Sequence, residues 1–343
     1  MTQLYVKEQG ARVSKRGERL VIKKGHEVID EVPMTRVNQL VVMGNVQVST
    51  QTLAALSARE IDVIYLTSRG KYRGSWEGHG SPRVTLRQSQ LRKFEDEAFC
   101  LRLAQQVVDS KINNQRIILQ RQAQRMTSSG FVVDRTLFQR GLAGMQQMQR
   151  QAVQASSLDT LRGYEGKAGA YYFEAVRSLL NKAWGFERRE YFPPPDPFNA
   201  LLSFSYALVT KDVYAAVQQI GLDPYLGFFH AVGRGRPSLA LDLMEEWRPV
   251  IADGMALELV NRRMLTPGVF EQTNNPRRPI QLGEDGVALV LQAYESRLGV
   301  KHFHPLAGPG GNATLRTAIK LQARQLSQVI SGDRPKFEPF KIK

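Results

Sequence analysis

Short hydrophobic runs alternate with turn residues over roughly the first 80 residues of the chain. Runs rich in Val, Ile, Leu and Tyr cover residues 12–14, 19–22, 39–43 and 62–66. Runs of this length and composition, bounded by turn signals, predict β-strands. One short helix is expected over residues 50–59, because Ser49 precedes it as a capping residue. The pattern therefore predicts a small β domain at the start of the chain.

The hydrophobic period changes after residue 82. Residues 86–126 contain no Gly or Pro and repeat apolar residues at helical spacing, and most of the remaining chain continues in this way. We therefore expect an α+β protein with a β domain over residues 1–82 and a larger helical domain over residues 83–343. The boundary is expected at a cluster of turn residues, namely Gly78, Gly80, Ser81 and Pro82.

One acidic residue lies on the apolar side of a predicted helix. Between residues 158 and 179, Glu165 falls on the same stripe as Ala168. A carboxylate that points inward needs a partner, because an isolated buried charge is very unfavourable. Gly166 and Gly169 flank this part of the helix, although each costs about 1 kcal/mol relative to Ala in a helix interior. The glycines predict a close approach, either by a ligand or by a crossing helix.

A second polar group follows the apolar run 226–229. His230 comes directly after this run, and Asp242 and Glu245 share one face of the next predicted helix because they are three residues apart. A histidine beside phenylalanines is usually a core residue with ordinary partners, and an Asp-x-x-Glu pair is usually a solvated helix face. Together with Glu165, however, these residues form a set that can close around a divalent cation.

The composition narrows the class of partner. Lys and Arg total 47 against 32 Asp and Glu, which gives a formal net charge of +15, so we expect a polyanion such as nucleic acid. The single cysteine, Cys100, excludes an intrachain disulfide and a Cys-based zinc site. The chain shows no uninterrupted apolar run close to the roughly 20 residues of a membrane span, so we expect no membrane partner and a cytoplasmic location.

Basic residues are frequent at the start of the helical region, but a charge run is usually a solvated helix face. Only alignment along one surface would make these residues a DNA track. His302 and His304 are expected in a surface loop, because Pro305 follows them and no acidic residues lie near them in the sequence.

Several motifs resemble those of one family along nearly the whole chain. They are Tyr164-Glu165-Gly166-x-Ala168, Trp184-Gly185-Phe186-x-x-Arg189, Pro194-x-x-Pro197-x-Asn199-x-Leu201-Leu202-Ser203-x-x-Tyr206, His230, Pro237-Ser238-Leu239-x-Leu241-Asp242-Leu243-Met244-Glu245, Leu321-Gln322-Ala323-Arg324 and the closing Phe337-x-Pro339-Phe340. The order and the residues of these motifs are similar to those of the CRISPR-associated protein one family, the integrase of CRISPR spacer acquisition.

The resemblance implies an N-terminal β-sandwich-like domain followed by a larger all-α catalytic domain. It also implies a homodimer that assembles with the small second CRISPR-associated protein and with double-stranded DNA, both spacer and CRISPR repeat. Carried over by position, the metal ligands fall on Glu165, His230 and Glu245, and Asp242 is the neighbouring catalytic acid. Some members carry Asp where Glu245 stands, which alters the length of the arm but not the ligand chemistry.

Arg236 matches a basic position of the family that faces DNA. The candidate DNA-binding residues are Arg83, Arg87, Arg234, Arg236 and Arg248.

The reaction expected from this resemblance is an in-line attack by a spacer 3′-hydroxyl on a repeat phosphodiester, with Mn²⁺ or Mg²⁺ as cofactor. His230 would be a ligand rather than a general base, and water in place of the 3′-hydroxyl would give nuclease activity. Two alternatives stay open. One is a structure-selective, metal-dependent DNA repair nuclease. The other is a non-catalytic nucleic-acid-binding scaffold, in which the acids merely pair with arginines such as Arg248.

Overall fold

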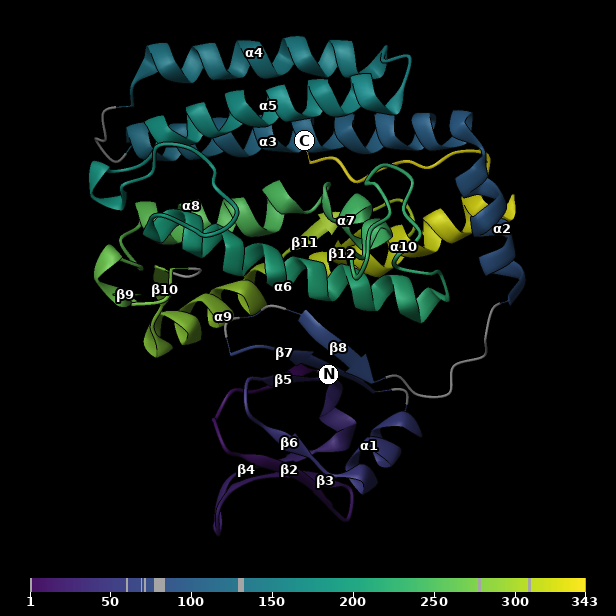
Figure 1. The fold of residues 1–343 in the computed structure, drawn as a ribbon, viewed down its shortest axis with the longest axis vertical. Helices are drawn as coiled ribbons and strands as arrows, with labels where there is room; N and C mark the ends of the chain where they lie inside the picture. The colour runs from purple at the N-terminus through teal and green to yellow at the C-terminus, as the bar shows by residue number, and fades with distance from the viewer. Residues whose placement is uncertain are drawn as a thin grey trace. The chain divides into compact units, whose positions relative to one another are not determined.

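The computed structural model describes residues 2–59, 61–68, 70, 72–76, 84–128, 133–276, 279–307 and 310–342. The chain divides into two compact units, residues 1–82 and residues 83–343. The turn residues expected at the boundary lie outside the described residues, as does Arg83. A strand-rich first unit followed by a mostly helical second unit confirms the predicted α+β class (Figure 1).

The first unit contains two four-stranded sheets. In the first sheet, with strand order β1-β5-β7-β8, the β1, β5 and β7 strands are parallel and β8 is antiparallel to β7. The second sheet has the order β4-β3-β2-β6 and is antiparallel except for the β2–β6 pair. The elements in chain order are β1 (Thr2–Val6), β2 (Arg12–Arg16), β3 (Arg19–Lys24), β4 (Glu27–Pro33), η1 (Met34–Arg36), β5 (Val37–Met43), β6 (Gln47–Val48), α1 (Thr50–Ser57), β7 (Asp62–Leu66) and β8 (Tyr72–Trp76).

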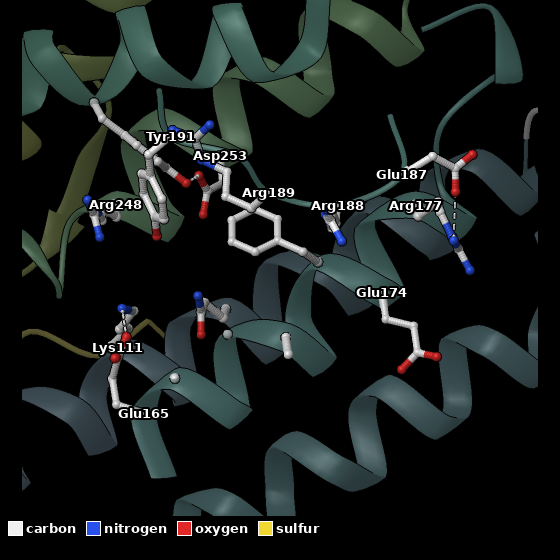
Figure 2. A pocket seen from close by; sticks show the side chains of 16 residues that line it. Lys111, Glu165, Glu174, Arg177, Glu187, Arg188, Arg189, Tyr191, Arg248 and Asp253 are labelled. Atoms are coloured by element: carbon white, nitrogen blue, oxygen red, sulfur yellow. Dashed lines mark hydrogen bonds and ion pairs between the residues drawn. The ribbon is translucent and has the colours of Figure 1, made fainter. Parts of the chain in front are cut away.

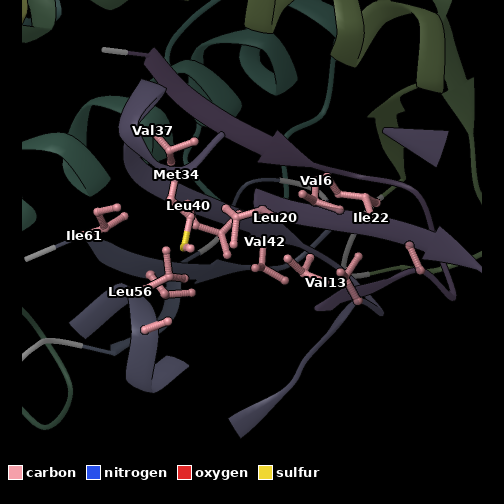
Figure 3. Packing of buried hydrophobic residues seen from close by; sticks show 14 residues of the cluster. Val6, Val13, Leu20, Ile22, Met34, Val37, Leu40, Val42, Leu56 and Ile61 are labelled. Carbon is pink, nitrogen blue, oxygen red and sulfur yellow. The ribbon is translucent and has the colours of Figure 1, made fainter. Parts of the chain in front are cut away.

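A single hydrophobic cluster joins the two sheets of the first unit. Val13 and Leu20 from one sheet and Leu40 and Val42 from the other are buried in it, and Leu56 of α1 packs at its side (Figure 3). Successive side chains of a strand point to opposite faces, so each sheet contributes one face to this core. The sandwich-like arrangement is therefore confirmed. The parallel pairing of β1, β5 and β7 was not predicted, because hydrophobic period does not reveal strand direction.

The second unit consists mostly of helices and adds two short two-stranded ribbons, β9–β10 and β11–β12. Its elements in chain order are α2 (Val84–Glu95), α3 (Glu97–Ser128), α4 (Arg135–Val153), α5 (Leu158–Ser178), η2 (Lys182–Trp184), α6 (Pro197–Ile220), α7 (Ser238–Met244), η3 (Arg248–Asp253), α8 (Gly254–Asn261), η4 (Pro267–Val269), β9 (Phe270–Gln272), β10 (Ile280–Leu282), α9 (Glu284–Leu298), β11 (Lys301–Phe303), β12 (Asn312–Thr314) and α10 (Leu315–Ser331).

The helical pattern over residues 86–126 belongs to two helices rather than one. Helix α2 ends at Glu95 and α3 begins at Glu97. Between them, the carboxylate of Asp96 accepts a hydrogen bond of 2.9 Å from the backbone N–H of Phe99. This bond satisfies one of the free N–H groups at the start of α3, so Asp96 acts as an N-terminal cap. Apolar spacing alone did not reveal the break.

The long helices α3, α4 and α5 pack side by side, and α6 lies across the interior of the same unit (Figure 1). Within the described residues, α6 is the one helix long and apolar enough to cross a membrane by length and composition. However, 83% of its most apolar window is buried inside the structure. Burial of that extent is typical of a core helix in a globular unit. Two elements that carry predicted site residues, α7 and η3, pack against this core helix.

Candidate metal centre

Two of the predicted acids meet at a lysine. Glu165 lies on α5 and Glu245 directly follows α7, and both carboxylates pair with the ammonium group of Lys111 on α3. The distance from Lys111 Nζ to Glu245 Oε2 is 2.6 Å, and Figure 2 shows the contact between Lys111 and Glu165. Three helices that are far apart in the sequence therefore bring two carboxylates to one positive charge.

His230 lies next to Glu245 and Asp242. Its Nε2 atom lies 3.7 Å from Glu245 Oε1, and its Nδ1 atom lies 2.7 Å from Asp242 Oδ1. An ionised carboxylate only accepts hydrogen bonds, so Nδ1 carries the proton and, in a neutral ring, Nε2 keeps its lone pair toward Glu245. A histidine that is held by a carboxylate through its other nitrogen is a common arrangement of metal ligands.

Asp242 accepts four hydrogen bonds from the segment that carries His230. The backbone N–H groups of Phe228, Phe229 and His230 donate to it at 2.6, 3.0 and 2.8 Å, and the His230 ring is its fourth donor. The structure therefore brings Asp242 into the centre as the support that orients His230, while its own oxygen atoms point at the loop backbone. Pro237 immediately precedes α7.

Glu245 is the most constrained acid of the group. Only 2% of its side chain is exposed, and Arg248 donates to its Oε1 atom at 2.9 Å. Burial by itself would raise the pKa of Glu245, but the positive charges of Arg248 and Lys111 outweigh burial and hold this pKa well below its ordinary value. The carboxylate is therefore ionised at neutral pH and available to a cation.

Lys111 was missed as a site residue, because the sequence placed it only among the basic residues of the helical region. A signal was present: Lys111 stands on the apolar stripe of α3, in register with the buried Ala104, Val107 and Ile118. A lysine on such a stripe requires acidic partners. Although burial would lower its pKa, Glu165 and Glu245 outweigh that effect and raise the pKa of Lys111 above its ordinary value.

A cavity of about 540 Å³ opens beside these residues. Lys111, Glu165 and Arg248 lie at one end of it, and Arg177, Arg188 and Glu187 line the other end (Figure 2). Its walls come from α5 and from the segment that precedes α6. Basic and aromatic side chains along an open cavity suit a nucleic acid strand, since arginine binds phosphate and aromatic rings stack on bases.

The glycines beside Glu165 face this cavity. A Cβ atom added to Gly166 or Gly169 would meet nothing within 4 Å, and both residues line the cavity wall. Of the two alternatives for the close approach, a ligand or a crossing helix, the structure contradicts the crossing helix and provides open space for a ligand. The helix crossing uses other glycines, because a Cβ at Gly141 or Gly144 of α4 would collide with residues of α5.

A π-helical turn, η3, aims two further side chains at the cavity. Arg248 at its start lies 4.5 Å from the centre of the Tyr206 ring, and Asp253 at its end accepts a hydrogen bond of 2.7 Å from the Tyr206 hydroxyl. Burial raises the pKa of Asp253 above its ordinary value, and hydrogen bonds from Tyr206 and Tyr172 oppose that shift. Turns of this kind occur frequently at functional sites, and sequence periodicity did not indicate one here.

The predicted DNA-binding arginines occupy different environments. Arg234 and Arg236 are exposed in the turn that follows His230, and Arg87 is an exposed residue of α2 whose side chain donates to Gly221 O at 3.3 Å. Arg248 is mostly buried and is paired with Glu245. Arg83 lies outside the described residues. Only Arg248 belongs to the group around Lys111, and the DNA contacts of the other arginines stay predictions.

The donor set fits a divalent cation, although the ligands are not closed around one point. Among the described parts of the chain, no three His, Cys, Asp or Glu side chains are close enough to form a ready metal site. The ammonium of Lys111 accounts for this, because it lies between the carboxylates of Glu165 and Glu245. Two carboxylates and a free imidazole nitrogen are suitable ligands for Mn²⁺ or Mg²⁺ once the ammonium moves aside.

Comparison with known proteins identifies the family. The family model described as CRISPR associated protein Cas1 matches residues 4–296 of the chain. The chain belongs to the Cas1 family. A relative named CRISPR-associated endonuclease Cas1 3, from Thermus thermophilus, is 33% identical over 342 residues, which cover 99% of this chain and 97% of the relative. The expected resemblance is confirmed, and so is the expectation of a Cas1-type endonuclease.

Solved structures of Cas1-type proteins share the fold. A casposase bound to integration product aligns with a TM-score of 0.81 at 20% identity and covers 100% of this chain and 95% of that one. A Cas6-RT-Cas1–Cas2 complex aligns with a TM-score of 0.81 at 22% identity over 100% of this chain and 36% of that one. These similarities concern the arrangement of the Cas1 fold, whereas the family assignment comes from the sequence comparisons.

Proposed function

We propose that this Cas1-family chain is a metal-dependent DNA endonuclease and integrase that inserts spacer DNA into a CRISPR repeat array. The observation that carries this proposal is that Glu165 and Glu245 both pair with the ammonium of Lys111, while His230 Nε2 lies 3.7 Å from Glu245 Oε1. A protein that holds a cation there with two carboxylates has the electrostatic requirements of a divalent metal site. The cavity beside it supplies room for a DNA strand.

Glu165, His230 and Glu245 would hold Mn²⁺ or Mg²⁺, and a bound cation would neutralise the negative charge that develops on the phosphoryl oxygens. Asp242 keeps the His230 ring oriented with Nε2 toward the ligands. Arg248 fixes the Glu245 carboxylate through Oε1. His230 is therefore a ligand in this proposal and does not take up the proton of the attacking hydroxyl.

The reaction exchanges one phosphodiester for another. The 3′-oxygen of the spacer forms a bond to phosphorus, the bond from phosphorus to the 3′-oxygen of the repeat breaks, and the proton of the attacking hydroxyl is balanced by one that the leaving oxygen gains. No oxidant or energy source is required. Water in place of the 3′-hydroxyl gives hydrolysis at the same residues, which agrees with the endonuclease name of the relatives.

Double-stranded DNA, both spacer and repeat, is the proposed polyanionic partner. The net charge of +15 favours phosphate binding through counterion release. Arg234 and Arg236 extend from the turn after His230 and are exposed, as is Arg87. We place Arg83, Arg248 and these three arginines on the DNA path as the candidates to test. If one of these arginines contacts backbone phosphates, its contribution to DNA affinity should fall as the salt concentration rises.

Assembly as a homodimer with the small second CRISPR-associated protein, in the cytoplasm and without a membrane partner, completes the proposal. Solved relatives include a Cas1–Cas2 complex, which supports the second protein as a partner. For the homodimer, the first unit offers the free edge of β4, where Val28 and Ile29 are exposed. Exposed sheet edges with apolar residues readily pair with another chain.

The decisive assay measures joining of a labelled spacer to supercoiled repeat DNA in the presence of the small partner and Mn²⁺. We expect a branched half-site product with the wild type and none in excess EDTA. Cleavage of branched DNA without any joined product would instead support the repair-nuclease alternative.

One structural observation favours the scaffold alternative. That alternative has the acids paired with arginines, and Glu245 is indeed paired with Arg248. A scaffold would bind DNA equally well in EDTA and would form no product after Mn²⁺ is restored. The family assignment argues against a scaffold, since the relatives in this family are named endonucleases.

A further inference from the structure

The last residues of the chain contact the two elements that carry Lys111 and Glu245. Residues 334–342, called the C-terminal tail below, follow α10 and run along α3 (Figure 1). Phe337, Phe340 and Ile342 are buried although the tail contains no helix or strand. A nine-residue segment without secondary structure is ordered only where other groups satisfy its backbone, so its partners define its role.

On α3, the tail binds Ser110, directly before Lys111, and Asn114, three residues after it. Ser110 Oγ donates to Phe340 O at 2.5 Å, and Asn114 Nδ2 donates to the same oxygen at 2.9 Å. The backbone N–H of Ile342 donates to Asn114 Oδ1 at 3.0 Å. Ser110 and Asn114 are four residues apart and share one face of the helix, so the tail fixes the rotation of α3 that presents Lys111 to the acids.

Beyond α7, the tail binds the residues that follow Glu245. The backbone N–H of Phe340 donates to Glu246 Oε2 at 2.5 Å, and the Phe340 ring stacks on Trp247 with a centroid distance of 4.6 Å. Asn114 Nδ2 also donates to Glu246 O at 3.0 Å, so this one amide joins α3, the Glu245 turn and the tail. The two adjacent glutamates therefore have different partners: Glu245 binds Lys111, and Glu246 binds the tail.

His302 of β11 and His304, which directly follows this strand, complete the pocket around Phe340. His302 and His304 lie 5.9 and 6.5 Å from its ring, measured between ring centroids, and His304 is buried. The prediction of a surface loop for these histidines was therefore wrong, since they pack on a part of the chain that is distant in the sequence. Phe340 is thus enclosed by Trp247 and these two rings.

We propose that the C-terminal tail is a clamp that positions Glu245 and Lys111 for cation binding, through its contacts with Asn114, Glu246 and Trp247. The inference rests on the proposed metal centre and adds a positioning element outside it. Each of these contacts lies within three residues of Lys111 or Glu245 in the sequence, and among the described residues the tail contacts these neighbours and not the ligands themselves. Supporting residues beyond the ligands commonly change metal affinity about 10–100-fold when they are removed.

The test compares Mn²⁺ affinity, measured by electron paramagnetic resonance of free Mn²⁺, with thermal stability in EDTA. One variant ends at Asp333 and lacks the tail, and a synthetic peptide of residues 334–343 is then added back. A second variant is Asn114→Ala. Gln122→Ala is the matched control, because Gln122 is also a buried amide on α3 and donates to a backbone oxygen, but its partner is Gly254 O of α8, at 3.4 Å, rather than the tail.

We expect Mn²⁺ affinity to fall about tenfold in the shortened chain and in Asn114→Ala, with recovery on addition of the peptide to the shortened chain. Gln122→Ala should keep wild-type Mn²⁺ affinity even where its melting temperature falls as much as that of Asn114→Ala. A folded shortened chain with wild-type affinity would overturn the proposal. If the shortened chain does not fold, Asn114→Ala decides, and wild-type affinity in that variant overturns the clamp.

The proposed function has its own control in the same experiment. Glu165→Gln removes a ligand that the tail does not touch. Wild-type protein that binds no Mn²⁺, or that binds it as well as Glu165→Gln does, would overturn the metal centre and the clamp together. Loss of affinity in Glu165→Gln with full affinity in both tail variants would overturn the clamp alone.

Discussion

Replacement of Lys111 by Met tests whether its ammonium occupies the place of the metal. The substitution keeps an unbranched side chain of similar length but removes the charge between Glu165 and Glu245. Only 8% of the Lys111 side chain is exposed, so water cannot replace the lost charge effectively. We expect metal-free Lys111→Met to be less stable and to bind Mn²⁺ more tightly than the wild type, because the cation no longer competes with an ammonium.

The magnitude follows from the contacts that remain. Removal of one partner from a buried ion pair typically costs about 3–5 kcal/mol. Glu245 keeps Arg248 at 2.9 Å, and 23% of the Glu165 side chain is exposed, so the low end of that range applies. About 3 kcal/mol corresponds to a fall of about 6–12 °C in melting temperature for a unit of this size. Binding of a cation that is present at about 100 times its Kd stabilises the folded chain by about 2.7 kcal/mol.

The assay is thermal unfolding at one fixed Mn²⁺ concentration and in EDTA. Lys111→Met should show a larger Mn²⁺-induced rise in melting temperature than the wild type. Lys211→Met is the matched control, since Lys211 is also buried and paired with an acid, Asp212, at 3.0 Å, on α6. The control should lose stability but keep the wild-type rise. An equal or smaller rise in Lys111→Met would refute the view that the ammonium stands where the metal binds.

Three further predictions concern the ligands and their support. Glu165→Ala and His230→Ala should each abolish strand transfer in the labelled-spacer assay while size-exclusion chromatography still shows the dimer; wild-type-like joining by either would reject the ligand assignment. Asp242→Asn should lower Mn²⁺ affinity about 10–100-fold in calorimetry. The Asp242 carboxylate accepts hydrogen bonds from three backbone N–H groups, and the amide would place its own N–H groups against them. Unchanged affinity would contradict the role of Asp242 in supporting His230. Burial raises the pKa of Glu246 from 4.5 to about 8, so the folded chain retains a proton that the unfolded chain releases, and the free energy of unfolding should fall between these pH values by up to about 1.4 kcal/mol per unit. Glu246→Gln should flatten this dependence in denaturant titrations, and an equally steep decline in the variant would disprove the assignment.

The parts of the fold that local pattern determines were predictable from the sequence. Alternating apolar residues and turn signals predicted the strands of the first unit, and the capping residue Ser49 predicted α1, whose Thr52 N–H indeed donates to Ser49. The direction of β1, β5 and β7 depends on pairing between segments that are distant in the sequence. The split between α2 and α3 depends on one side-chain cap at Asp96. Neither the strand direction nor the helix break changes the spacing of hydrophobic residues, so that spacing could not predict them.

The sequence predicted the acids and the histidine of the candidate site, but not the positive charge of the lysine that lies between the acids. Family motifs pointed to Glu165, His230 and Glu245. The structure pairs the two glutamates with Lys111 and places His230 beside Glu245. Lys111 needed a different signal, a charged residue on an apolar stripe. The contacts of Glu246 with the tail could not be predicted at all, because they join residues separated by 94 positions.

Crystals soaked in Mn²⁺ test the central claim most directly, through anomalous scattering recorded at the manganese absorption edge. We expect a single strong peak within ligand distance of Glu165, His230 Nε2 and Glu245, with the Lys111 ammonium displaced from between the two carboxylates. A peak elsewhere on the protein, or no peak with Lys111 still bound to both acids at saturating Mn²⁺, would contradict it.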